Sequence, residues 1–174
     1  RLSIALRSNG NPVISYQNGT NDLRLLNCLD DLCNERNYPL PVAAIHPDGY
    51  SSIAVRSDNM PIIAHANNIT LVGNFLRVAD CNSTDCASVT YRNVYTTGLP
   101  SGTADQVAMA MRASNLPFIA FHDPAFTGVY AYDCDDSDCA TGNVRTLVFA
   151  NDTGFQPSVT IRASGRPIIA YKDV

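Results

Sequence analysis

Six cysteines are the residues of this sequence whose spacing most plainly implies chemistry. No histidine recurs beside them to complete the four ligands of a zinc site, so disulfides are the expected chemistry. Each copy of a C-x4-C pattern brings its own pair, which selects one pairing among the many possible. Three bridges are predicted, each contributing about 2 kcal/mol by closing a short loop: Cys28–Cys33, Cys81–Cys86 and Cys134–Cys139. Disulfides persist in oxidising compartments, so we expect an extracellular or cell-surface protein.

Four aspartates crowd the third cysteine loop: Asp133, Asp135, Asp136 and Asp138. Calcium prefers carboxylate oxygens, which makes this loop a candidate calcium site. The two corresponding loops, over 29–32 and 82–85, contain fewer acids. The interpretation that we favour is therefore a solvated hairpin tip, with no metal and no cofactor.

Four N-x-T sequons are candidate glycosylation sites: Asn18, Asn68, Asn82 and Asn151. All four fall in expected loops between strands, where a glycan could be carried. We therefore expect a glycoprotein. The alternative is that Asn and Thr serve there simply as turn residues.

Catalytic side chains are sparse. His46, His65 and His122 occupy unrelated or variable positions, and the pair His122-Asp123 does not recur in the other repeats. The sequence contains no G-x-S-x-G motif, no P-loop and no metal-binding histidine pair. We expect no catalytic residue, and hence no enzyme.

An internal repeat organises the chain. Four segments align without gaps at intervals of about 50 residues: 3–16, 52–65, 108–121 and 158–171. An arginine and a proline recur in all four: Arg7, Arg56, Arg112 and Arg162, and Pro12, Pro61, Pro117 and Pro167.

The recurring arginines could line a groove for acidic sugars. The interpretation that we favour is structural, in which each arginine covers a neighbouring aromatic ring or pairs with a polar residue at the end of the next strand. Those polar residues are Asn18, Asn67, Asp123 and Asp173.

Each aligned segment is predicted to be a β-hairpin. The pair Asn9-Gly10 and its counterparts tolerate the positive φ angles of a two-residue turn, which places Arg7 opposite Pro12. In that register Ile14 lies on one face and Ile4 on the other, and both faces are apolar. Such strands must be covered on both sides, as they are in a stack of sheets.

After each hairpin a third strand ends at the first cysteine, and a fourth strand follows the second cysteine. The predicted fold class is all-β: tandem four-stranded antiparallel meanders, similar to propeller blades, stacked in an array. Repeat 1 spans 1–50, repeat 2 spans 51–106, repeat 3 spans 107–156, and 157–174 form a terminal hairpin.

Composition narrows the possible partners. A net charge of −4 argues against binding to nucleic acid, which requires clustered Lys and Arg. No apolar run has the length of a membrane helix. The chain opens with Arg1 and shows no signal peptide, so we expect a mature form or a segment of a longer protein.

The pattern R-S-x-G-x-P-x-I-A-Y-x-D, followed by C-x4-C, resembles a repeat of secreted and cell-surface proteins with propeller-like blades. The resemblance covers the whole chain and implies a scaffold, an adhesin or a glycan-binding surface. The chain departs from sialidase and lectin propellers, because it contains no Trp and no S-x-D-x-G-x-T-W box.

The terminal hairpin duplicates the first one without a third and fourth strand, so its edges predict head-to-tail contact with a neighbouring copy or repeat. The contact is expected to bury Ile161, Ile168, Ile169 and Tyr171. We expect a non-enzymatic extracellular structural repeat glycoprotein that forms an elongated assembly or filament. The alternative is a carbohydrate-binding, propeller-type module of a larger secreted protein, with glycans as partners.

Overall fold

The structure, a computed structural model, describes residues 2–18, 22–38, 50–69, 73–96, 106–123, 128–149 and 153–173, with the backbone alone for 67–69, 73–74 and 153–154. These residues form strands β1 to β14 and no helix. Accordingly, no helix in the described ranges is long and apolar enough to cross a membrane.

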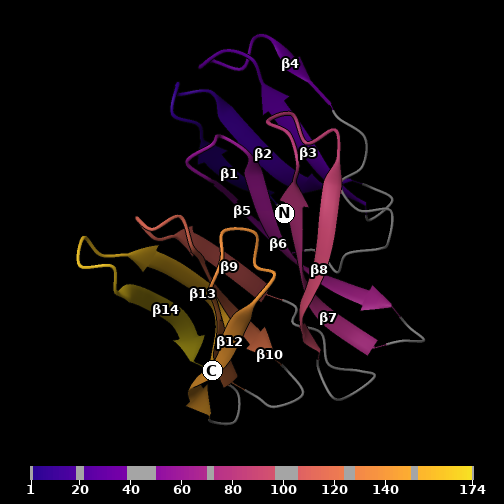
Figure 1. Ribbon diagram of the computed structural model, residues 1–174. Helices are drawn as coiled ribbons and strands as arrows, with labels where there is room; N and C mark the ends of the chain where they lie inside the picture. Colours follow the sequence, from indigo (N-terminus) through magenta and orange to yellow (C-terminus); the bar gives the residue numbers. More distant parts are fainter. Residues whose placement is uncertain are drawn as a thin grey trace.

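Three antiparallel meanders and a hairpin make up the fold, which confirms the predicted fold class (Figure 1). The first sheet contains β1 (Leu2–Leu6), β2 (Pro12–Gln17), β3 (Leu23–Cys28) and β4 (Arg36–Asn37). The second contains β5 (Ser51–Val55), β6 (Pro61–Ile69), β7 (Gly73–Cys81) and β8 (Val89–Thr96). The third contains β9 (Gln106–Met111), β10 (Pro117–Asp123), β11 (Gly128–Cys134) and β12 (Gly142–Phe149). The hairpin consists of β13 (Thr153–Ile161) and β14 (Pro167–Asp173).

The hairpin turns differ from the prediction by one residue. Leu6, not Arg7, lies opposite Pro12, because the loop contains three residues between Arg7 and Asn11. The backbone N–H of Arg7 donates to the Asn11 carbonyl at 3.1 Å, and Gly10 adopts a φ of +88°. This is the three-residue loop in which a turn is followed by one left-handed residue.

The longer loop also corrects the predicted faces. Ile4 now lies opposite Ile14 and on the same face, whereas Ala5 and Val13 form the other. One extra loop residue moves a whole strand to the opposite face, because side chains alternate. Pro12 still removes no ladder bond to β1, because the pair next to the hydrogen-bonded Arg7–Asn11 pair is not hydrogen-bonded.

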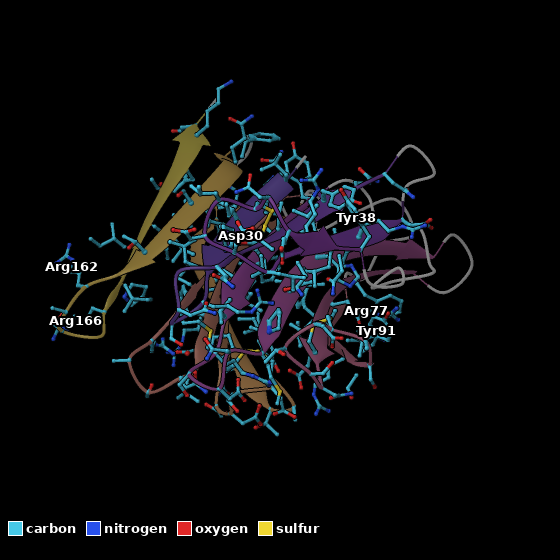
Figure 2. All side chains as sticks on the ribbon, turned by 90° about the horizontal axis from the view of Figure 1, so that it is seen from above. Asp30, Tyr38, Arg77, Tyr91, Arg162 and Arg166 are labelled. Carbon is cyan, nitrogen blue, oxygen red and sulfur yellow. A yellow bond between two sulfur atoms is a disulfide. The ribbon has the colours of Figure 1, made fainter. Side chains whose placement is uncertain are left out.

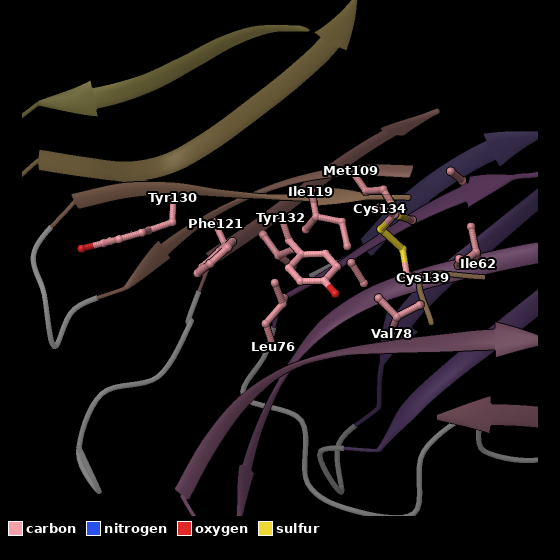
Figure 3. Packing of buried hydrophobic residues seen from close by; sticks show 13 residues of the cluster. Ile62, Leu76, Val78, Met109, Ile119, Phe121, Tyr130, Tyr132, Cys134 and Cys139 are labelled. Atoms are coloured by element: carbon pink, nitrogen blue, oxygen red, sulfur yellow. A yellow bond between two sulfur atoms is a disulfide. The ribbon is translucent and has the colours of Figure 1, made fainter. Parts of the chain in front are cut away.

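The sheets stack face to face with their first strands side by side, so that β1 contacts β5, β5 contacts β9 and β9 contacts β13. Figure 1 shows this fan, with the β1–β4 sheet and the hairpin at its two ends. One core lies between the first and second sheets, and a larger one lies between the second and third. Figure 3 shows the larger core, in which Phe121, Tyr132 and Ile119 face Leu76 and Val78. Both faces of the second sheet are therefore buried, as the apolar strands predict.

Two side-chain hydrogen bonds recur where one repeat meets the next. Near the beginning of the first strands, Ser3 Oγ accepts from the Ile53 N–H at 3.2 Å, and Ser52 Oγ accepts from the Met109 N–H at 2.9 Å. At the turns, two asparagine side chains accept backbone N–H groups of the preceding repeat. The Ser8 N–H donates to Asn59 Oδ1 at 2.9 Å, and the Ser57 N–H donates to Asn115 Oδ1 at 2.8 Å.

Candidate functional site

The recurring arginines lie at the turn end of the fan, and two of them, Arg56 and Arg112, bind acids of the third strand. The Arg56 guanidinium contacts Asp80 at 2.5 Å and donates to the Cys81 carbonyl at 3.1 Å, with both charged side chains nearly buried. Arg112 pairs in the same way with Asp133 and lies over the ring of Phe118. The predicted contact of a recurring arginine with a neighbouring aromatic ring is thus confirmed for Arg112.

The prediction that the arginines pair with polar residues at the end of the second strand was wrong. Residues such as Asp123 end the second strand, at the opposite end of the hairpin from the turn that carries the arginine. The acids within reach lie one residue before the first cysteine of the C-x4-C pattern, at Asp80 and Asp133. Their recurrence was a signal in the sequence that could have identified them.

Arg7 behaves differently, because Asn27 occupies the acid's position in the first repeat. Its guanidinium reaches across to the second repeat and donates to the Thr84 carbonyl at 2.6 Å. Burial lowers the pKa of Arg7, and the charge of Asp85 opposes that shift. An arginine without an acid in its own repeat thus connects to the next repeat.

The three predicted disulfides are confirmed: Cys28–Cys33, Cys81–Cys86 and Cys134–Cys139. The second cysteine of each pair adopts a left-handed φ between 54° and 59°. Asp30, two residues after Cys28, accepts backbone N–H groups across its loop, including that of Glu35 at 2.7 Å. Hydrogen bonds from the backbone, the one from Glu35 foremost, lower the pKa of Asp30. The bridges imply an oxidising environment.

The aspartates of the candidate calcium loop have separate protein partners. Asp133 binds Arg112, Asp138 binds Arg92 of the second repeat, and Asp135 accepts from the Asn143 amide at 3.0 Å. Asp136 caps its loop, accepting the Ala140 N–H at 2.6 Å as Asp30 does in the first repeat. Within the described ranges, no three metal-ligating side chains come together.

Two of the four sequon asparagines can be placed with their side chains. Asn18 is half-buried and accepts the Asp22 N–H at 2.8 Å, whereas Asn82 is exposed and donates to Ser88 at 3.2 Å. Only the backbone of Asn68 is described, and Asn151 lies outside the described residues. Glycosylation stays a prediction.

Polar groups are also buried along the second strands. His65 is fully buried, its Nδ1 lies 3.2 Å from the Ala66 carbonyl oxygen, and burial lowers its pKa to about 4. His122 packs against Phe155 with ring centroids 4.5 Å apart, and the Tyr95 hydroxyl donates to Asp123 at 2.9 Å. Burial raises the pKa of Tyr95, and the hydrogen bond to Asp123 adds to that shift. The contacts of His122 and Asp123 join neighbouring sheets of the fan. His46 lies outside the described residues.

A groove of about 490 Å³ lies where the first strands begin. Tyr50, Ser51 and Gln156 contribute to its lining. Its hydroxyl groups already bind protein atoms, since Ser51 contacts Ser15 Oγ at 3.0 Å and Ser52 accepts the Met109 N–H. Tyr50 supplies an aromatic ring of the kind that sugars stack on.

The outer face of β1 is apolar and exposed. Leu2, Ile4 and Leu6 are 71%, 56% and 63% exposed. The residues aligned with Ile4 in the next two repeats, Ile53 and Met109, are 4% and 7% exposed because the preceding sheet covers them. The outer face of β1 therefore has the same apolar character as the faces of β5 and β9 that the preceding sheet covers.

The hairpin leaves a second such face at the other end of the fan. Ile161 and Ile169 lie on its half-buried face, next to the third sheet, while Ile168 and Tyr171 are 41% and 40% exposed. An external contact was expected to bury all four residues. Ile168 lies on the outward face of the hairpin, whereas Ile161, Ile169 and Tyr171 occupy the opposite set of alternate positions, so a contact on the outward face would bury Ile168 alone among the four. The outward face also carries Ser158.

No known protein family matches the sequence, and no curated protein matches it. Solved structures do match its fold. A Dyadobacter fermentans protein of unknown function superposes with a TM-score of 0.70 at 16% identity, over 97% of this chain and 47% of that protein. A Penicillium chrysogenum alpha-L-arabinanase complexed with arabinobiose gives 0.66 at 12% identity, over 92% of this chain and 53% of the arabinanase.

A thermostable family-43 glycoside hydrolase gives a TM-score of 0.67 at 8% identity, over 99% of this chain and 63% of the hydrolase. At such low identities these superpositions show the fold alone, which is propeller-like. The chain spans about half the length of the first two structures.

Proposed function

We propose that the chain is a non-enzymatic, extracellular repeat scaffold, glycosylated at its loops, whose end faces join further repeats into an elongated assembly. The observation that carries the proposal is the exposure of Leu2, Ile4 and Leu6, on a face where the second and third repeats bury Ile53 and Met109, the counterparts of Ile4. A contiguous exposed apolar patch of this kind marks an interaction surface.

The use of the polar side chains supports a structural role. The acids of the cysteine loops bind arginines or cap turns, and hydroxyl groups at the groove join neighbouring repeats. The three disulfides fit an extracellular location.

The test is the mass of the native protein as a function of concentration, measured by light scattering. We expect the average mass to rise with concentration for the wild type, and elongated particles in electron micrographs. The Ile4→Asp variant is expected to stay monomeric, because an unpaired charge would have to be buried in the contact. Val144→Asp is the matched control, since Val144 is 45% exposed on β12, away from both end faces. A monodisperse wild-type monomer at all concentrations would contradict the proposal.

A carbohydrate-binding module is the second candidate function. The fold is similar to that of an arabinanase that binds arabinobiose, and the groove at the strand starts contains Tyr50. Calorimetry with arabinobiose tests this candidate. Saturable binding by the wild type that is lost in Tyr50→Ala would support it, and no heat of binding from either protein would count against it.

A further inference from the structure

We propose that the β1 face of one copy docks on the β13–β14 hairpin of a second copy, in the register of the internal junctions, with Arg162 of one copy lying at Asp31 of the other. This inference rests on the proposed function and names its partner, a second copy of this chain.

The first argument is continuity with the internal junctions. At the junction between the second and third sheets, one face contains Ala54, Ile62 and Ala64, and the facing side contributes Met109 and Ile119. The residues that align with the first group lie on the outward face of the hairpin: Thr160, Ile168 and Ala170. The residues that align with Met109 and Ile119 are Ile4 on β1 and Ile14 on β2. The two ends therefore carry the two halves of one kind of junction.

The second argument comes from the strand-start hydrogen bond. Ser3 and Ser52 each accept a backbone N–H from the next first strand. Ser158 occupies the same position in the hairpin and is exposed. In the docked pair, Ser158 Oγ accepts the Ile4 N–H of the second copy.

The third argument is the position of charge. Arg7 has no acid in its own repeat and bonds to the carbonyl of Thr84, three residues after Cys81. The side chain of Arg162 has no ion pair or hydrogen bond in the part of the chain that the structure describes, and it projects from the hairpin together with Arg166 (Figure 2). The residue three positions after Cys28, which aligns with Thr84, is Asp31.

Charge complementarity follows from that alignment. The hairpin end carries Arg162 and Arg166, whereas the loop that it would meet carries Asp30, Asp31 and Glu35. Four of these residues are exposed, and Asp30 is half-buried. Opposite charges at the rim of an interface fix its register and accelerate encounter.

The test is a charge exchange measured by analytical ultracentrifugation. The acid-side variant is Asp31→Arg, and the basic-side variant combines Arg162→Glu with Arg166→Glu. These side chains are exposed, so each variant is expected to keep its fold, which far-ultraviolet circular dichroism and thiol counting verify. Each variant alone is expected to self-associate on the order of tenfold more weakly than the wild type. The equimolar mixture, which restores opposite charges at each junction, is expected to recover the wild-type mass.

The outcomes separate the two claims. If the wild type assembles but both variants assemble equally well, the register proposed here is wrong, while the scaffold proposal stands. If each variant associates weakly and the equimolar mixture also associates weakly, the proposed register is wrong as well, because the exchanged charges then do not face one another. If the wild type remains monomeric, the scaffold proposal itself fails.

Discussion

The arginine that follows each first strand takes its partner from the third strand of its own repeat where an acid is present there. Arg56 and Arg112 have Asp80 and Asp133, whereas Arg7 meets Asn27 and bonds to the next repeat instead. A guanidinium is always charged and presents several donors, so it needs an acceptor wherever it is buried. One Asp-to-Asn difference therefore decides whether the arginine joins strands or repeats.

Removing the buried acid should destabilise the second repeat. Arg56 and Asp80 are both nearly buried, so Asp80→Ala leaves an unpaired charge, at a cost of about 3–5 kcal/mol. Asp58→Ala is the matched control, because Asp58 lies 3.5 Å from the same guanidinium but is exposed to solvent. Its effect should stay below about 1 kcal/mol. Urea unfolding measures both; equal effects would mean that burial does not set the strength of the pair.

His65 should make the protein sensitive to acid. Burial lowers its folded-state pKa to about 4 from the ordinary 6.5. The unfolded chain therefore binds the proton first, and stability that is complete above pH 6.5 falls as the pH drops towards 4. The loss is about 3 kcal/mol.

The His65→Phe variant isolates this effect, because Phe121 occupies the same position in the third repeat. Unfolding free energies measured between pH 7 and 4 should fall less steeply for the variant than for the wild type. Identical slopes would show that another group causes the acid sensitivity.

At the scale of elements, the strands could be predicted from the sequence, but their register could not. Gly10, Asn59, Asn115 and Gly165 mark the turns correctly, and all four adopt positive φ angles. The same residues suit both a two-residue turn and the left-handed position of a three-residue loop, so composition does not separate the two. The partner of the arginine could not be assigned either, because it depends on which end of the hairpin each residue occupies.

The turn asparagines also join repeats, which makes Gly165→Asn a stabilising substitution. Asn59 and Asn115 accept N–H groups of the preceding repeat, whereas Gly165 has no side chain to accept the Ala113 N–H. An added Cβ at Gly165 meets no atom within 4 Å. Asparagine tolerates the left-handed conformation, so we expect a gain of about 0.5–1.5 kcal/mol in thermal or chemical unfolding.

Gly10→Asn is the control for that substitution. It makes the same change at the same φ region, but no described repeat precedes the first one. It should not stabilise the monomer. A gain of equal size in both variants would indicate a local effect on the turn rather than a bond between repeats.

At the scale of the whole molecule, stability resides in the junctions, as in other repeat proteins. The junctions between the three sheets have both the serine and the asparagine hydrogen bonds. At the junction with the hairpin, Ala108 replaces the serine and Gly165 replaces the asparagine. The contacts that remain at this junction include the apolar contact of one hairpin face, the tilted packing of Phe155 against His122, and a hydrogen bond from the Gln156 N–H to the side chain of Gln106.

The hairpin should therefore open before the sheets do. Local openings begin where buried contacts and interlocking hydrogen bonds are fewest. In hydrogen exchange of the monomer, the amides of β13 and β14 are expected to exchange at least about tenfold faster than those of β6, β7, β10 and β11, whose described side chains are almost all buried. Gly165→Asn should slow exchange in β13 and β14 and leave the other strands unchanged. Uniform exchange across all strands would instead show that the hairpin and the three sheets unfold as one cooperative unit, and the missing junction bonds would then have no energetic consequence.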